Sequence, residues 1–346
     1  MINDDPNCKS SVSVRDVARL AGVSIATVSR SFNKPDVVKK EVREKIFQVA
    51  ASIGYQANTA AKTLRSKKSY TIGAVIPTLD HAIYAKIMKS FQEELSAHGY
   101  ALYIVPCGFD ASNIFENIKF LLERGVDAIL FIGSIIDKKL TKHLLRAKIP
   151  VICTYSYHKE NPDFPFIGFD NYKSTIEILE YLYTLGHKDI AMISGPTKGN
   201  DRQITRTNAF NDFMKSRNLS YCLKQCQSQY DIAYGQEYFY DIMNENPNTT
   251  AIICSSDILA FGVMSGAKKI NIKVPERLTI IGYDNLDFSK YMTPSLTTLD
   301  IPAKEMGLIS ARKILSKLRD NIEITSLELP TKIIIRDSSN QALNFN

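Results

Sequence analysis

The first 55 residues carry apolar side chains with helical spacing, in three separate runs. A period of three or four residues places these side chains on one face of each helix. They are Val14, Val17, Ala18 and Ala21 in the first run, Ile25, Val28 and Phe32 in the second, and Val42, Ile46, Val49, Ala50 and Ile53 in the third. Ser13 and Asp16 form a capping-box pattern at the first helix, and Ser24 is positioned to cap the second. Gly22 ends the first helix, and two short helices joined by a tight glycine-containing turn are typical of a helix-turn-helix.

From Tyr70 onward, apolar strands alternate with amphipathic helices. The predicted strands cover residues 71–77, 100–106, 127–132, 150–155, 189–194, 250–255 and 278–283. Predicted helices include residues 83–97, 114–123, 172–185, 259–269 and 303–318. Such regular alternation predicts parallel sheets with helices on both faces. The number of units indicates two sheets, and therefore two doubly wound α/β subdomains with a cleft between them.

The charge of the chain is concentrated at its start. Residues 1–69 hold 13 lysines and arginines against 6 acidic residues, a net charge of +7, which equals the net charge of the whole chain. The remaining residues carry equal numbers of basic and acidic side chains. This asymmetry indicates a polyanionic partner for the first segment and a different role for the rest, although a basic surface also favours solubility.

Several classes of protein are disfavoured. The start of the chain contains Asp4 and Asp5 and no apolar run, unlike a signal peptide, and no stretch approaches the length of a membrane span. We therefore expect a cytoplasmic protein with no membrane partner. Scattered cysteines in apolar strands fit free thiols in a reducing compartment: Cys8, Cys107, Cys153, Cys222, Cys226 and Cys254. Cys222 and Cys226 lack the accompanying pair of ligands that a zinc site requires, so we expect no metal and no cofactor.

A doubly wound enzyme is the main alternative from another class. Residues 194–199 follow a strand and contain glycine, but they match neither a Walker A loop nor a dinucleotide fingerprint. Residues 262–266 lack the spacing of a nucleophile elbow, and the five histidines show no metal-ligand spacing. Catalysis is therefore not expected.

Residues 14–30, VRDVARLAGVSIATVSR, closely resemble the DNA-binding domain of the lactose-repressor (LacI/GalR) family. The resemblance continues through residues 42–46, 53–55 and 58–64, and then through 185–187, 193–196, 256–257, 281–284 and 296–298. Each later piece is weak alone. In this order and at the family's spacing they are specific, and they extend the resemblance over nearly the whole chain.

The resemblance implies a small all-α helix-turn-helix headpiece (residues 1–57), a hinge helix and linker (58–69) and a periplasmic-binding-protein-like core (70–336). The core would consist of an N-subdomain at about 70–168 and 300–330 and a C-subdomain at about 169–299 and 331–336. The polar residues 337–346 are predicted to form a disordered tail.

The function implied is transcription regulation, with repression favoured over activation. A homodimer would bind a near-palindromic double-stranded DNA operator, and a small-molecule effector, a sugar or sugar derivative, would bind in the core cleft. The alternative within the same class is a DNA-binding protein whose core only dimerises or binds a protein partner.

The second helix matches the family element that enters the major groove. Arginine can bond guanine with two hydrogen bonds, and small apolar side chains can contact the thymine methyl group. The candidates for base contacts are therefore Ile25, Ala26 and Arg30; the alternative is a solvated helix face with Ile25 packed inward. Phosphate contacts, which fix register, are expected from Thr27, Ser29 and Asn33, and Ser24 at the start of the helix completes the set.

Residues 58–64 resemble the hinge helix, which in the family pairs with its dimer mate in the minor groove. Leu64 would be the wedge between base steps, with Asn58 and Lys62 as further DNA contacts. The alternative is that Leu64 is a core residue of a short helix. Ala57 stands where the family usually has proline, so the entry to this helix is less rigid. A helix of two turns is not stable alone, so we expect it to order on the operator.

The resemblance also supplies candidates for the effector site. Arg206 aligns with an arginine that contacts effectors, and Asp284 with an aspartate across the cleft; both side chains can bond ligand hydroxyls. Tyr84 and Tyr230 fall where the family places aromatic rings against the ligand, and Ser256 where a small polar residue lines the cleft. The alternative is that Arg206 and Asp284 form an ion pair between subdomains, with the tyrosines as core.

Neighbouring positions refine this picture. Asp257 is expected to cap the following helix, and Asp80 and Asn171 are weaker effector candidates from adjacent loops. Tyr155 lies near a position that is acidic in several sugar-binding members of the family, and Ile301 occupies a position that is often glutamine. Both departures lower the polarity of the cleft, which argues against simply copying the effector of a known sugar-binding member.

Overall fold

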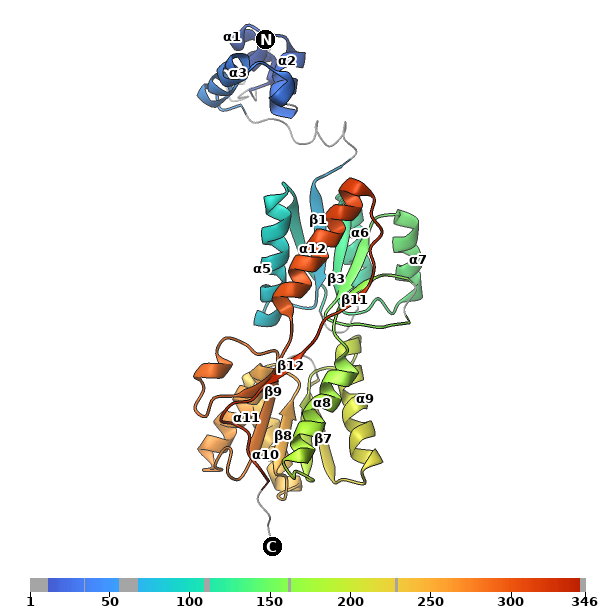
Figure 1. Cartoon of the computed structure of the whole chain (residues 1–346), viewed down its shortest axis with the longest axis vertical. Helices are drawn as coiled ribbons and strands as arrows, with labels where there is room; N and C mark the ends of the chain where they lie inside the picture. Colours follow the sequence, from blue (N-terminus) through green and yellow to red (C-terminus); the bar gives the residue numbers. More distant parts are fainter. Residues whose placement is uncertain are drawn as a thin grey trace, which may run out of the picture. The chain divides into compact units, whose positions relative to one another are not determined.

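The computed structural model describes residues 12–33, 35–55, 68–108, 113–160, 163–227 and 230–342 (Figure 1). The chain separates into two compact units, Met1–Lys67 and Lys68–Asn346. The first is helical and the second is α/β, which confirms the predicted fold class. No helix among the described residues combines the length and the apolar character needed to cross a bilayer.

The first unit is a small helical headpiece. It contains α1 (Val14–Ala21), α2 (Ile25–Asn33), the 3-10 helix η1 (Pro35–Val37) and α3 (Lys40–Ser52). Its core consists of apolar residues that the sequence pattern places on one face: Val17, Ala18, Ala21, Val28, Ile46 and Ala50. Gly22 ends α1 with a φ of 68°, a left-handed conformation that suits glycine. The chain can therefore reverse within three residues and pack α2 against α1.

The second unit begins with a parallel sheet that forms the N-subdomain. Its strands are β1 (Thr71–Ile76), β2 (Ala101–Pro106), β3 (Ala128–Ile132), β4 (Val151–Thr154), β5 (Phe166–Gly168) and β11 (Leu327–Glu328), in the spatial order β11-β5-β4-β3-β1-β2. The accompanying helices are α5 (Ala82–Ala97), α6 (Ile114–Glu123), α7 (Lys138–Ala147) and α12 (Ala303–Asp320). Helices α5 and α12 lie side by side although they are far apart in sequence (Figure 1).

A second sheet forms the C-subdomain. Its strands are β6 (Ile190–Ser194), β7 (Tyr221–Gln225), β8 (Ala251–Cys254), β9 (Thr279–Tyr283), β10 (Thr297–Asp300) and β12 (Lys332–Ile334), in the order β12-β10-β9-β8-β6-β7, with only β12 antiparallel. The helices are α8 (Asn171–Thr184), α9 (Asp201–Ser216), α10 (Ile232–Glu245), α11 (Asp257–Lys269) and the short η2 (Ser289–Tyr291). The chain passes between the two sheets three times, after β5, after β10 and after β11.

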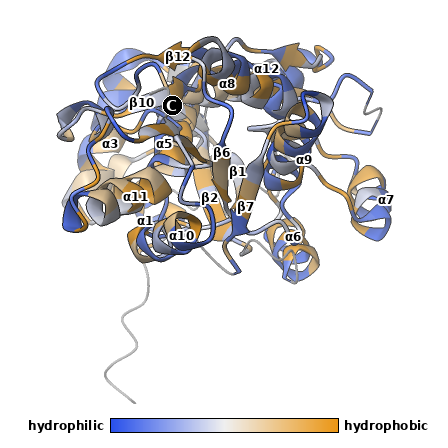
Figure 2. Ribbon diagram, turned by 90° about the horizontal axis from the view of Figure 1, so that it is seen from below, coloured by the Kyte–Doolittle hydropathy of each residue, from blue (hydrophilic) through white to orange (hydrophobic). Residues whose placement is uncertain are grey.

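The central strands are buried on both faces, which explains their continuous apolar runs. All residues of β3, β4, β6, β8 and β9 are buried. In Figure 2 the surrounding helices carry both hydrophobic and hydrophilic colour, as expected for amphipathic helices that cover a sheet. The five described cysteines have free thiols, and four of them are buried.

The predicted disorder of the tail is wrong for residues 337–342. Ser338 is fully buried: its hydroxyl donates to the carbonyl of Ile280 (2.7 Å) and accepts from the N–H of Thr297 (2.8 Å). The side chain of this polar residue therefore satisfies backbone groups of two inner strands of the second sheet, β9 and β10. Composition alone does not distinguish such a residue from a solvated one.

Candidate DNA-binding surface and effector cleft

The outer face of α2 is exposed at the positions predicted to read bases. Ile25, Ala26 and Arg30 are exposed, whereas Ser31 is buried and Val28 is part of the headpiece core. Ile25 is 46% exposed, so the alternative in which it packs inward is wrong. An exposed isoleucine at the start of a surface helix presents an apolar contact of the kind that a thymine methyl group accepts.

Polar groups at the start of α2 hold the helix in place. The Ser24 hydroxyl accepts a hydrogen bond from the Thr27 N–H (3.1 Å) and lies 2.9 Å from the Thr27 hydroxyl, which confirms Ser24 as the cap. Ser29 is half-buried on the same helix. No carboxylate of the described headpiece residues lies within 4.0 Å of Arg30, so its charge is available to a partner. The side chain of Asn33, and Asn58, Lys62 and Leu64, lie outside the described residues.

Arg206, on α9, is only 2% exposed and lies beside Tyr155 of the N-subdomain, where the sequence predicts the core cleft. Its Nε donates to Oδ1 of Asn171 (2.8 Å) and its Nη1 to the carbonyl of Ser255 (2.9 Å). The guanidinium stacks 3.5 Å from the ring centroid of Tyr283. Its Nη2 has no acceptor among the described residues. A donor that is buried and unpaired in this way is available to a ligand.

Asp284 follows β9 and belongs to the same subdomain as Arg206, so the expectation that it lies across the cleft is wrong. The residue across the cleft is Tyr155, whose hydroxyl donates to Oδ1 of Asp284 at 2.5 Å. Burial raises the pKa of Asp284 to about 7, although the nearby Arg206 guanidinium acts in the opposite direction. In the described part of the chain, Arg206 and Asp284 form no ion pair within 4.0 Å. The ion-pair alternative is therefore wrong as well.

Aromatic rings line the cleft on the side of α5. Tyr84 stacks on His81 with 5.8 Å between ring centroids, and His81 meets Tyr230 edge-on at 4.8 Å. The structure thus brings both predicted tyrosines to one place, and both are buried. The Tyr230 hydroxyl accepts from Nδ2 of Asn200 (3.2 Å), while Oδ1 of Asn200 has no partner among the described residues. Among the described residues, the cleft therefore holds one unpaired donor, Nη2 of Arg206, and one unpaired acceptor, Oδ1 of Asn200.

The assignment of the cap at α11 needs correction. Ser256, predicted to line the cleft, is the residue that caps α11, because its hydroxyl accepts from the Ile258 N–H (3.2 Å); it also bonds Asp284. Asp257 is not the cap. Its buried carboxylate binds the segment after β9, accepting from Ser289 (2.5 Å), Thr298 (2.5 Å) and the Leu286 N–H (2.7 Å). Asp257 is therefore a structural residue behind the cleft.

Sequence reasoning missed a second group of cleft residues at the start of α9. Oδ2 of Asp201 accepts hydrogen bonds from the hydroxyls of Ser134 and Ser156, both at 2.7 Å. Arg202 donates through Nη1 to the carbonyl of Ile132 (3.2 Å) and to Oδ1 of Asp201 (3.0 Å). Three of these bonds cross from the C-subdomain to the N-subdomain, where they reach the end of β3 and the loops after β3 and β4. We call Asp201 and Arg202 the α9 clamp.

A glycine makes room for the α9 clamp. Gly133, directly after β3, has a φ of 100°, and a Cβ added there would lie 1.9 Å from Nη1 of Arg202. An apolar strand that ends in glycine is the sequence signal for a close approach at this point. Of the weaker candidates, Asn171 is part of the Arg206 network, whereas Asp80 is exposed and bonds Thr78.

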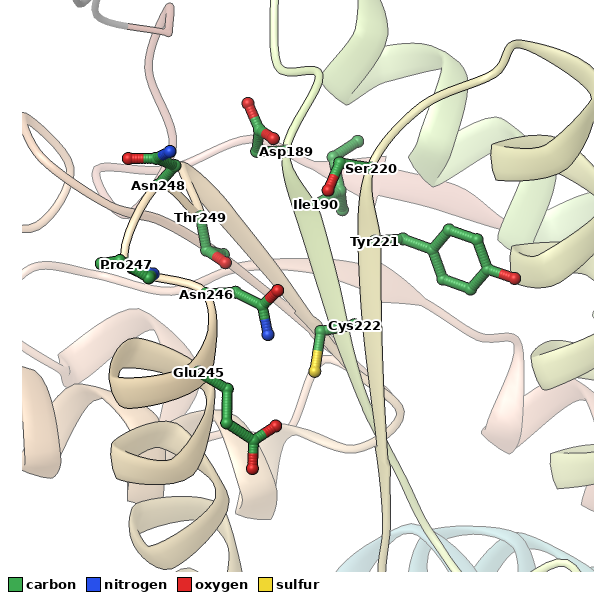
Figure 3. A pocket seen from close by; sticks show the side chains of 10 residues that line it. All are labelled: Asp189, Ile190, Ser220, Tyr221, Cys222, Glu245, Asn246, Pro247, Asn248 and Thr249. Atoms are coloured by element: carbon green, nitrogen blue, oxygen red, sulfur yellow. The ribbon is translucent and has the colours of Figure 1, made fainter.

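Two cavities flank the buried cleft residues. One, of about 380 Å³, is lined by residues 156–160 and 170–172 with Thr205. The other, of about 620 Å³, is lined by the crossover segments at 300–305 and 329–332 with Lys86 and Asp284. A third, of about 170 Å³, lies at the start of β6 and β7 beside the end of α10 and includes none of the cleft residues (Figure 3).

A helix-turn-helix that exposes Arg30 on its second helix, in one chain with a two-subdomain α/β core that buries polar side chains between the subdomains, is typical of a DNA-binding regulator. Residues 13–58 match the bacterial regulatory proteins of the lacI family, and residues 179–339 match a periplasmic binding protein-like domain. The chain is therefore similar to the LacI family of transcription regulators in its headpiece and to periplasmic binding proteins in much of its core.

Individual relatives cover nearly the whole chain. Catabolite control protein A of Priestia megaterium is 27% identical over 95% of this chain and 99% of its own length. The fold is that of the lac repressor dimer bound to operator and the anti-inducer ONPF, with a TM-score of 0.84 at 22% identity over 96% of this chain and 100% of that one. A LacI family regulator from Enterococcus faecium with bound ribose has a TM-score of 0.68 at 22% identity, over 79% of this chain and 100% of that one.

Proposed function

We propose that this regulator is a cytoplasmic repressor that binds a near-palindromic DNA operator as a homodimer, and that a small-molecule effector in the core cleft controls its affinity for the operator. The observation that carries the effector part is the unpaired Nη2 of Arg206. Leaving a buried donor without an acceptor costs about 1–3 kcal/mol. A ligand that supplies the acceptor recovers this free energy.

The operator part rests on the exposed face of α2. Two headpieces would place their α2 helices in successive major grooves, with Arg30 bonding a base edge in each half-site. Residues 58–64 would meet in the central minor groove, where Leu64 would separate a base step. The lac repressor structure that shares this fold holds a dimer on its operator, which supports the same arrangement here.

The effector is a sugar or sugar derivative in this proposal. Arg206 and Asp284 offer a donor and an acceptor for hydroxyl groups, and the rings of Tyr84 and Tyr230 offer flat faces for the apolar side of a sugar ring. The relative from Enterococcus faecium, which contains ribose, supports this class of ligand.

Ligand screening and one substitution test the proposal. Sugars, sugar phosphates and nucleosides are screened by thermal shift, because a ligand that binds the native state raises its melting temperature. Operator affinity is then measured by fluorescence anisotropy with and without each hit. The expected result is that a hit changes operator affinity in the natural protein and that Arg206→Ala abolishes this response while ligand-free operator binding stays intact. Lys215→Ala, at an exposed position of the same helix, is the control.

Two outcomes contradict the proposal. Equal ligand responses of the natural protein and Arg206→Ala would remove Arg206 from the effector site. If no compound changes operator affinity, control by a protein partner becomes the better interpretation.

A further inference from the structure

We propose that Tyr155 is a built-in occupant of the cleft, which in the ligand-free protein takes the Asp284 acceptor and holds the two subdomains together, and which an effector must displace. This inference rests on the proposed role of the cleft as an effector site. It makes Tyr155 a residue that determines which ligands bind and how strongly, by competing with them from within the same chain.

Tyr155 contacts both of the polar groups that the effector is proposed to bridge. Its hydroxyl bonds Asp284 at 2.5 Å, and the Arg206 guanidinium lies 5.8 Å from the centroid of its ring. Arg206 and Asp284 do not pair with each other in the described part of the chain. A ligand that contacts both groups therefore needs space that the Tyr155 ring now occupies.

The backbone of Tyr155 joins the same network. Nδ2 of Asn171 donates to the Tyr155 carbonyl (3.1 Å), while Oδ1 of Asn171 accepts from Nε of Arg206 (2.8 Å). Movement of residue 155 is thus transmitted through one amide side chain to the arginine. Because Tyr155 follows β4 in the N-subdomain and Arg206 lies in the C-subdomain, this link couples ligand contact to the arrangement of the subdomains.

The conformation of Tyr155 is held by its contacts. The side chain is 3% exposed, and its ring meets Tyr84 at 5.7 Å and Phe169 at 5.5 Å between centroids. Its φ of 70° lies in the left-handed region, which is unfavourable for a bulky residue and persists only where surrounding contacts enforce it. Breaking the bond to Asp284 removes one of these contacts, so the native position of the ring becomes less favourable.

A single tryptophan provides the readout, because the chain contains none. Tyr157→Trp places the reporter two residues from Tyr155, at the cavity of about 380 Å³ beside the cleft. Quenching of its fluorescence by acrylamide reports how open this side of the cleft is. Tyr155→Phe is then added to the full-length reporter protein, since it keeps the ring and removes only the hydroxyl. Tyr103→Phe, at an exposed tyrosine of the same subdomain, is the matched control.

We expect Tyr155→Phe to raise the quenching constant at least about twofold and to change ligand-free operator affinity about tenfold, the scale of one buried hydrogen bond. Asp284→Ala breaks the same bond from the other side and should raise quenching similarly. Tyr103→Phe should change neither quantity. Unchanged quenching in both Tyr155→Phe and Asp284→Ala would overturn the proposal.

Ribose and cellobiose serve as probes of displacement. If either binds, Tyr155→Phe should bind it about tenfold more tightly, because the acceptor is already vacated; equal dissociation constants would overturn the displacement step. Failure of the proposed function is distinguishable from failure of this inference. A protein that binds no operator refutes the function, whereas the quenching comparison decides the role of Tyr155 without DNA or ligand.

Discussion

Replacing Gly133 by alanine should release the α9 clamp. The added Cβ would lie 1.9 Å from Nη1 of Arg202 and 2.8 Å from Oδ1 of Asp201, so both side chains must move away from the N-subdomain. A non-glycine residue at a φ of 100° costs about 1–3 kcal/mol. Displacing Arg202 from the carbonyl of Ile132 forfeits a hydrogen bond to a charged group, which contributes about 1.5–3 kcal/mol. The expected loss of unfolding free energy is therefore about 4 kcal/mol.

Thermal unfolding followed by circular dichroism measures this loss. For a domain of this size, each kcal/mol lowers the melting temperature by about 2–4 °C, so Gly133→Ala should lower it by about 10 °C. Gly125→Ala is the matched control, because Gly125 has a φ of 70° but an added Cβ there meets nothing within 4 Å. The control carries only the backbone cost, about 1–2 kcal/mol. Equal decreases in the two variants would refute the proposed clearance at Gly133.

Three further predictions concern other parts of the molecule. Burial raises the pKa of Asp284 to about 7. Between about pH 4 and 7 the native state therefore keeps a proton that the unfolded state releases. As the pH rises through this range, the free energy of unfolding falls by up to about 1.4 kcal/mol per pH unit. Asp284→Asn removes this pH dependence. The free energy of unfolding of the variant, measured by urea unfolding and compared with that of the natural protein, should therefore increase from pH 5 to 7 and stay constant above pH 8. Parallel pH profiles of the two proteins would contradict a protonated Asp284 carboxyl. Ser338→Ala should lower the free energy of unfolding by about 2 kcal/mol, because two buried backbone groups lose their partner, whereas Ser96→Ala at an exposed position should leave urea unfolding unchanged. Arg30→Ala should weaken operator binding by about 1–3 kcal/mol per half-site and relax preference at one base pair, whereas Lys62→Ala should weaken all sequences alike; retained preference in a competition assay with mutated operators would exclude Arg30 from base reading.

The hydrophobic pattern predicts those helices and strands whose burial shows as a regular pattern within their own segment of the sequence. The three headpiece helices can be recognised because their buried residues recur with the helical period of 3.6. The central strands can be recognised because they form short, continuous apolar runs. Strands β5, β11 and β12 have only two or three residues, too few for a pattern. Strand β7 is half-buried and contains Lys224 and Gln225, so its sequence does not stand out as a strand.

Some cleft residues were predicted from the sequence and others were not. Arg206, Asp284, Tyr84 and Tyr230 were identified through the family resemblance and not from spacing, and the structure brings them together. The α9 clamp was not predicted, because adjacent charged residues at the start of a helix are usually solvated. Asp201 and Arg202 are buried only because the loops after β3 and β4, which are distant in sequence, pack against them. The contact of Tyr155 with Asp284 likewise joins residues from different subdomains, and no local pattern encodes it.

The edge strands β11 and β12 are among the last elements of the chain to be translated. Strand β11 completes the first sheet beside β5, and β12 completes the second beside β10. Helix α12, which covers α5, is also made late. A ribosome must therefore reach Glu328 before the first sheet has all its strands and Ile334 before the second has, whereas the headpiece helices need only their own neighbours. A stop codon placed after β10 would thus spare the headpiece but remove one edge strand from each sheet, so even a late truncation affects both subdomains.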